Sequence, residues 1–328
     1  MTATSATAAE RPVSAATERA VAFVAEMLPR AVGLGRAIAE DVGDPDAFAH
    51  ALASAFDALA DPVYGAEQAR VAPGIGQVHG VRLPLLTAVR KSFERATRRE
   101  SSARLLFLAE RLLRAPSMEP RWFAIGILDR TLRSEPERTW QLLRRAGREA
   151  ADWITIDTLA HPVGRGILRE PYRWAELEQL VISPNRWERR LVGSTIATIP
   201  FVDRTAGRTP EVADRGLAIL ATLIGDTEPD VQKALAWAYR SMAIVDLAAT
   251  TTALETEARL AAASHDGLRA WVIRDAAPKL ATADAARLKA MVDGLRRKPG
   301  VEPTSRAAEL AHRFEGMGLG RPLPEPPL

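Results

Sequence analysis

Apolar residues recur about every 3.6 positions along nearly the whole chain, which is the period of an amphipathic α-helix. No segment alternates between apolar and polar residues with β-branched enrichment. The nearest candidate, residues 71–81, is interrupted by glycines, which weaken a strand. Four prolines stand at or beside expected helix starts, where a missing N–H costs little: Pro84, Pro120, Pro136 and Pro229. The chain is therefore predicted to be all-α.

The helical segments also repeat. Four of them open alike, with a turn residue or two before an apolar anchor, and the anchors Trp122, Trp187, Val231 and Leu268 are 65, 44 and 37 residues apart. These separations are irregular but close to the length of HEAT-type helical hairpins, which stack into a curved solenoid. A HEAT-like helical-repeat solenoid with a concave basic face is predicted. Its helices are expected at about 15–41, 45–60, 84–97, 101–114, 119–132, 136–147, 150–161, 173–183, 186–199, 210–224, 229–242, 250–263, 267–280, 284–296 and 303–315, with a loop from Pro62 to Gly80.

Five regions are expected along the chain: a flexible arm (1–14), an N-terminal helical extension (15–63), a HEAT-like-repeat core (64–282), C-terminal helices (283–317) and a proline-rich tail (318–328). No stretch approaches the roughly 20 apolar residues of a membrane span. Residues 1–13 lack the apolar segment of a secretory signal. A monomeric protein of the cytosol is therefore expected. The Ala- and Arg-rich composition is compatible with a high-GC bacterium.

The motifs of several common enzyme classes are missing from the sequence. There is no cysteine, which excludes disulfides and thiolate chemistry. The five histidines show no zinc-binding spacing, and there is no G-x-S-x-G elbow and no phosphate-binding G-x-x-x-x-G-K-[ST] loop. We expect neither a metal nor a cofactor. The net charge of +3 is modest, but the pI of about 9.5 and the clustering of arginines within particular helices suit a polyanionic partner.

A tryptophan and an aspartate in one segment form the first candidate site. Trp153 and Asp157 are four residues apart, so on a helix they share one face. An indole offers an electron-rich face to a cationic group, and a carboxylate stabilises developing positive charge or holds a water. The alternative is structural, with Trp153 in the core and Asp157 at a solvated helix end.

Two further segments combine tryptophan with cations. In residues 186–193, Arg186 and Arg190 are one turn apart and, with Arg189, are candidates for phosphate contacts. Trp187 aligns with apolar residues and is predicted to be buried. Lys233, Trp237 and Arg240 form a single stripe, as on surfaces that bind nucleic acid. The alternatives are a solvated basic face for the first segment and a core Trp237 flanked by snorkelling cations for the second.

Weaker basic stripes lie on either side of these segments. Arg274 belongs to a stripe with Arg269 and Trp271, in which the tryptophan could equally be packing. Arg90 and Lys91 begin a basic run that is most simply a solvated helix, with phosphate contact as the sharper alternative. Each stripe alone is a weak signal.

Taken in order, the segments resemble the HEAT-like-repeat alkylpurine DNA glycosylases, the AlkD-like family. The resemblance runs from about residue 64 to 280. It begins with Gly80-Val81-Arg82-Leu83-Pro84 and the basic helix after it, and continues with the helix around Arg121-Trp122-Phe123. W-x-x-x-D at Trp153 and Asp157, W-x-x-R at Trp187 and Arg190, and Q-K-A-x-x-W at Gln232 to Trp237 follow. Three such motifs in this order are moderately specific.

The resemblance implies a role for each matched residue. Asp157 matches the catalytic carboxylate, Trp153 and Trp237 match the tryptophans that contact the deoxyribose of the lesion, and Arg190 matches an arginine that engages the DNA backbone. Arg189 is the weaker candidate for that last role. The remaining cations predicted to contact DNA are Lys233, Arg240, Arg186, Arg90, Lys91 and Arg274.

The implied activity is that of a monofunctional glycosylase without a cofactor. It would hydrolyse the N-glycosidic bond of N3- or N7-alkylated purines, bulky adducts included, in double-stranded DNA. Two alternatives stay open: a non-catalytic protein that binds damaged DNA or DNA shape, and a HEAT-type scaffold for protein partners. The residues alone do not distinguish methyl from bulky lesions, or general repair from antibiotic self-resistance, and they give no role to the N-terminal extension.

Overall fold

The structure, a computed structural model, describes residues 14–317. Within this range the chain forms sixteen α-helices, three short 3-10 helices and no strand, apart from an isolated bridge between Gln77 and Ser117. The predicted all-α class is therefore confirmed. None of the helices between residues 14 and 317 is long and apolar enough to cross a membrane. The expected arm, except Ser14, and the expected tail lie outside the described residues.

The helix starts follow from local sequence chemistry. Asp44, Asp61, Asp152 and Asp266 each accept backbone N–H bonds at the start of the helix that follows, as N-cap residues do. The helices are α1 (Ala15–Ala37), α2 (Pro45–Asp57), α3 (Pro62–Val71), α4 (Leu83–Ala96), α5 (Ser102–Leu113), α6 (Met118–Thr131), α7 (Pro136–Glu149), α8 (Trp153–Arg169), α9 (Arg173–Gln179), α10 (Arg186–Val202), α11 (Pro210–Leu223), α12 (Pro229–Val245), α13 (Leu247–Ser264), α14 (Gly267–Ala276), α15 (Thr282–Met291) and α16 (Arg306–Gly316). The 3-10 helices are η1 (Ile38–Asp41), η2 (Leu180–Ile182) and η3 (Ala277–Lys279).

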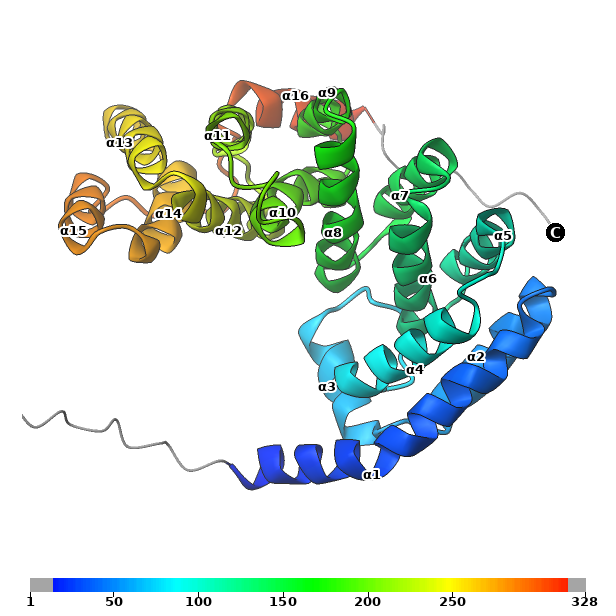
Figure 1. The fold of residues 1–328 in the computed structure, drawn as a ribbon. Coiled ribbons are helices and arrows are strands. Elements are labelled where there is room, and N and C mark those ends of the chain that lie inside the picture. Colours follow the sequence, from blue (N-terminus) through cyan, green and yellow to red (C-terminus); the bar gives the residue numbers. More distant parts are fainter. Residues whose placement is uncertain (1–13, 318–328) are drawn as a thin grey trace, which may run out of the picture.

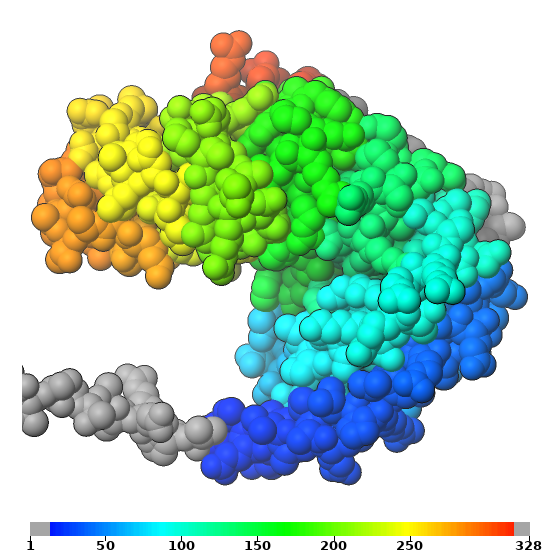
Figure 2. Space-filling view, in the orientation of Figure 1, coloured from blue at the N-terminus to red at the C-terminus, as the bar shows by residue number. Residues whose placement is uncertain are grey.

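The helices stack into a curved solenoid (Figure 1). We call α6, α8, α10, α12 and α14 the inner row, because each contacts the next and the row faces the inside of the curve. Helices α5, α7, α11 and α13 pack against this row from the other side. The curve leaves a hollow between the N-terminal helices, where α1 packs on α4, and the half of the molecule that contains α10 to α15 (Figure 2).

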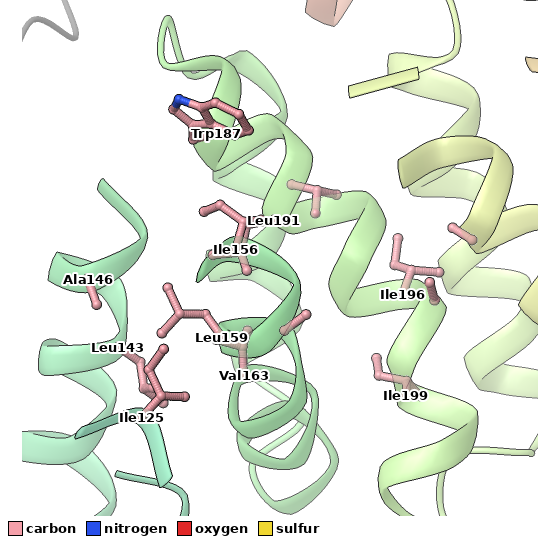
Figure 3. Close-up of a cluster of buried hydrophobic side chains, with 14 of the residues drawn as sticks. Ile125, Leu143, Ala146, Ile156, Leu159, Val163, Trp187, Leu191, Ile196 and Ile199 are labelled. Carbon is pink, nitrogen blue, oxygen red and sulfur yellow. The ribbon is translucent and has the colours of Figure 1, made fainter. Parts of the chain in front are cut away.

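The core runs through the solenoid as one continuous apolar layer. Near the N-terminal end the rings of Phe48, Phe93 and Phe123 pack with centroids 5.3–6.2 Å apart. In the middle, side chains of four helices belong to one buried cluster: Ile125 of α6, Leu143 of α7, Leu159 and Val163 of α8, and Leu191 and Ile196 of α10 (Figure 3). Trp187 is 9% exposed, which confirms its predicted burial. Because both α8 and α10 bury apolar side chains where they pack together, their orientation relative to each other is fixed.

Several helix boundaries differ from the prediction, and α15 ends at Met291 rather than at about 296. Residues 62–71 form α3, although Pro62 and Gly65 suggested a loop. Pro62 occupies the first turn, where proline fits, and Gly65 lets Gly80 approach closely. Gly80 itself adopts a φ of 82°, and a Cβ on it would lie 2.6 Å from the Asp61 carbonyl oxygen. Helices α8 and α10 were expected to end at about 161 and 199 but continue to Arg169 and Val202, past Pro162 and Pro200.

Candidate active site

The start of α8 sets the position of the candidate carboxylate. The Asp152 side chain, which is buried, accepts hydrogen bonds from Thr155 N at 2.8 Å and Thr155 Oγ1 at 2.7 Å. This cap makes Trp153 the first residue of α8. Asp157 follows one turn later on the same face of the helix. The shared helix face predicted for Trp153 and Asp157 is therefore present.

Asp157 is held by two side chains of α10. Arg190 donates from Nε to Oδ1 at 3.1 Å and from Nη2 to Oδ2 at 2.8 Å. Ser194 donates from Oγ to Oδ1 at 2.6 Å. The Asp157 side chain is still 21% exposed, whereas the Arg190 side chain is 7% exposed. The carboxyl group is thus held in place by charge-assisted hydrogen bonds, and part of it stays open to solvent.

Arg190 is also bound to α12. Its Nη1 donates to the backbone carbonyl oxygen of Asp230 at 2.6 Å, and the Asp230 carboxylate lies 3.9 Å away. One buried guanidinium therefore joins α8, α10 and α12 of the inner row. The predicted contact of Arg190 with the DNA backbone stays a prediction.

Trp153 is anchored to the last residue of α3, which is distant in the sequence. Its indole is half-buried and donates from Nε1 to the Val71 carbonyl oxygen at 3.3 Å. The loop that follows Val71 is fastened by the buried carboxylate of Glu119 at the start of α6. Glu119 accepts the backbone N–H groups of His79, Gly80 and Val81 at 3.0, 2.7 and 3.2 Å.

Trp237 lies on α12, two turns after Asp230. It is half-buried and packs against the core with one side of its indole. Lys233 is exposed one turn before it, and Arg240 pairs with Asp275 of α14, with Nη1 2.5 Å from Oδ2. The predicted stripe of Lys233, Trp237 and Arg240 is therefore partly open, and its last cation is held by an ion pair.

The other cations predicted to contact DNA occupy different environments. Lys91 is exposed. Arg186 is exposed and lies 3.3 Å from Glu228. Arg90 is half-buried and bonds with Glu94 at 2.6 Å. Arg274 is half-buried and donates to the Val292 carbonyl oxygen at 2.9 Å. Its pKa is lowered, mainly by desolvation of the guanidinium and also by repulsion from Arg296.

Arg189 requires a correction. Its side chain is 3% exposed, and it donates from Nε to Asp226 Oδ2 at 2.7 Å and from Nη1 to the Ser183 carbonyl oxygen at 2.8 Å. One step along a helix turns a side chain by about 100°. Arg189 therefore faces away from Asp157, and its guanidinium has no free side for a phosphate.

Sequence reasoning missed three residues that shape the site. Ser194 is one turn after Arg190, so helical spacing could have placed it beside Asp157. Glu119 reaches its loop across 38 to 40 residues, and no local pattern signals that contact. His161 is one turn after Asp157. Its side chain reaches solvent, but the surrounding protein partly desolvates the imidazolium and so lowers its pKa; Arg165 adds to this shift, while Asp129 and Asp157 oppose it.

The fold and the site define a helical-repeat protein with an anchored carboxylate on its inner row. A family model described as DNA alkylation repair enzyme matches residues 52–280, which is more than two thirds of the chain. The chain belongs to this family and has a role in DNA alkylation repair. A comparison with curated proteins found no match. Helix α1 precedes the matched region, and α15 and α16 follow it.

Proposed function

We propose that the protein hydrolyses the N-glycosidic bond of cationic alkylated purines in double-stranded DNA and leaves a free base and an abasic site. The observation that carries the proposal is the Asp157 carboxylate, which is fixed by Arg190 and Ser194 and stays 21% exposed. A carboxylate that serves only to neutralise a buried arginine needs no such opening.

The chemistry requires an anion more than it requires a proton donor. A purine alkylated at N3 or N7 already carries positive charge and departs with the electron pair of the C1′–N bond. The deoxyribose is left with oxocarbenium character, and the oxygen of a water adds to C1′ while a water proton goes to solvent. Asp157 would stabilise this cationic sugar and accept a hydrogen bond from the attacking water.

The two tryptophans are the proposed contacts for the sugar. Both indoles are half-buried, so each packs on the core and leaves part of its surface uncovered. The face of an indole attracts a cation within about 6 Å of the ring. In this proposal Trp153 and Trp237 add to the electrostatic effect of Asp157 on the reacting sugar.

The duplex would be held by exposed cations around the site. Lys233 lies one turn from Trp237, and Arg186 lies at the start of α10, one turn before the arginine that binds Asp157. Lys91 is on α4, one of the N-terminal helices on the other side of the hollow. Phosphate contacts of this kind position the duplex without selecting a sequence.

The test is base release from a duplex that contains N7-methylguanine, measured in single turnover with wild type, Asp157→Asn and Asp214→Asn. Asp214 is an exposed aspartate on α11, on the other side of the inner row, and serves as the matched control. Loss of one electrostatic group at a transition state costs about 3–4 kcal/mol, or a rate loss of about 10²- to 10³-fold. We expect this loss in Asp157→Asn and none in Asp214→Asn.

Two outcomes would contradict the proposal. Base release by Asp157→Asn at the wild-type rate would remove the carboxylate from its role. Tight, salt-dependent binding of duplex DNA without release of any adduct, methyl or bulky, would instead favour a non-catalytic DNA-binding protein. Thermal melting of each variant shows whether a slow variant is still folded.

A further inference from the structure

The chain beyond α15 turns back along the solenoid. Helix α15 lies at the end of the row, whereas α16 packs against α11 and η2 (Figure 1). The connecting segment, residues 292–305, therefore passes the beginnings of α14 and α12 on its way. We call residues 292–305 the return segment. It lies entirely outside the region that matches the family model.

The return segment is fastened to the helices that it passes. Arg297 donates from Nη1 to Gln232 Oε1 on α12 at 2.6 Å, and its guanidinium lies 4.6 Å from the ring centroid of Trp271 on α14. Thr304 N donates to the Gly225 carbonyl oxygen at 3.0 Å. At Gly267, the first residue of α14, a Cβ would collide with the Arg296 carbonyl oxygen, so the backbones touch there.

Three consecutive cations, Arg296, Arg297 and Lys298, are exposed on this segment. We call residues 296–298 the basic loop. Arg297 is engaged by Gln232 and Trp271, but Arg296 and Lys298 form no ion pair with any residue between 14 and 317. A fixed backbone that carries unpaired cations is suited to bind an anion, since little conformational freedom is lost on binding.

The basic loop lies at the same edge of the inner row as the candidate site. Three contacts lie at the beginnings of these helices: Arg186 with Glu228 and Arg190 with Asp230 join α10 to α12, and Gln232 of α12 binds Arg297 of the basic loop. The first turns of α10 and α12 and the loop at α14 are thus neighbours. Glu228 and Gln232 are one turn apart on α12, so the loop continues the line of exposed cations from Arg186, away from Asp157.

We propose that the basic loop is a phosphate-binding site for the backbone of duplex DNA on one flank of the lesion. The inference rests on the proposed function for its choice of partner. A duplex carries a negative charge about every 1.7 Å along its axis, so a row of cations continuing past the reaction centre meets further phosphates. The loop contributes affinity without sequence preference and does not touch the reacting sugar.

The test measures binding of full-length protein to an unmodified duplex that extends past both ends of the solenoid, over a range of salt concentrations. The test variant is Arg296→Gln with Lys298→Gln, which leaves the packed Arg297 in place. The matched control is Arg259→Gln with Arg313→Gln, two exposed cations on α13 and α16. Each lost phosphate contact lowers the slope of log K against log salt by about 1, so a drop of about 2 and a several-fold weaker affinity are expected for the test variant alone.

Equal binding by the test and control variants would overturn the inference, whether both weaken or neither does. Base release by wild type from an alkylated duplex is scored separately and decides the proposed function. If the basic loop contributes to duplex binding but no base is released, this inference is supported and the proposed function is contradicted. If base is released but the test variant binds as wild type does, the proposed function is supported and this inference is contradicted. Melting curves establish that both variants are folded.

Discussion

Two neighbouring arginines of α10 make nearly the same contacts in different surroundings. Arg189 binds Asp226 and Arg190 binds Asp157, in both cases through Nε and a terminal nitrogen. The Asp226 side chain is 1% exposed, whereas the Asp157 side chain is 21% exposed. The pair of Arg189 and Asp226 is enclosed by protein. Arg189 also donates to the carbonyl oxygen of Ser183, which is buried as well.

The difference in exposure separates a structural pair from a candidate reactive one. An enclosed carboxylate and guanidinium neutralise each other, and neither can meet a substrate. An anion that is equally well held but partly open can interact with charge that develops outside the protein. Two pairs on one helix therefore offer a comparison in which the chemistry is similar and the access differs.

The largest expected effect comes from breaking the enclosed pair. Asp226→Ala leaves the buried Arg189 without its counter-ion, and such a loss costs about 3–5 kcal/mol in the free energy of unfolding. Chemical denaturation measures this change. Base release per folded molecule should stay at the wild-type level. If Asp226→Ala were as stable as wild type, the enclosed pair would not have the role assigned to it.

A smaller effect is expected from exchanging each arginine for lysine. Lysine keeps the charge but cannot bond both carboxylate oxygens in a fixed plane. Arg190→Lys loosens Asp157, and loss of a charge-assisted hydrogen bond worth about 1.5–3 kcal/mol predicts base release at least about tenfold slower in single turnover. Arg189→Lys should lower stability and leave that rate unchanged. Equal rates in the two variants would erase the distinction between the pairs.

The smallest effect is expected at His161, beside the open pair. Its pKa in the folded protein is below the ordinary 6.5, because partial desolvation by the surrounding protein and the charge of Arg165 disfavour the imidazolium more than Asp129 and Asp157 favour it. The unfolded chain then binds the proton more readily, so this contribution to stability is present above about pH 6.5 and is lost as the pH falls towards the folded pKa. His161→Gln should therefore weaken the acid dependence of the unfolding midpoint. An unchanged dependence would show that His161 is no more desolvated in the fold than in the unfolded chain.

Much of the fold followed from periodicity, because packing on a helical row imposes the same spacing on every helix. The all-α class and the burial of Trp187 were predicted on this basis. The errors have local causes. Pro62 reads as a loop residue but starts α3, and α8 continues past Pro162 because packing on α10 outweighs the missing hydrogen bond.

The contacts of the arginines could not be predicted from helical spacing. Arg189 and Arg190 differ by one helical step, and only the family resemblance favoured Arg190; spacing alone does not tell which of the two faces Asp157. The decision comes from acceptors far along the chain, Asp226 at 37 residues and Asp230 at 40. Glu119 is a similar case, since its partners are loop amides rather than side chains with a recognisable pattern.

One acceptor of Arg190 is a main-chain oxygen, and this has a genetic consequence. Substitutions at Asp157 or Ser194 remove their part of the contact directly. The Asp230 carbonyl oxygen is present whatever side chain that codon specifies, so its contribution is insensitive to most single missense changes there. A change at position 230 therefore removes only the carboxylate that lies 3.9 Å from Arg190 and leaves the 2.6 Å bond in place.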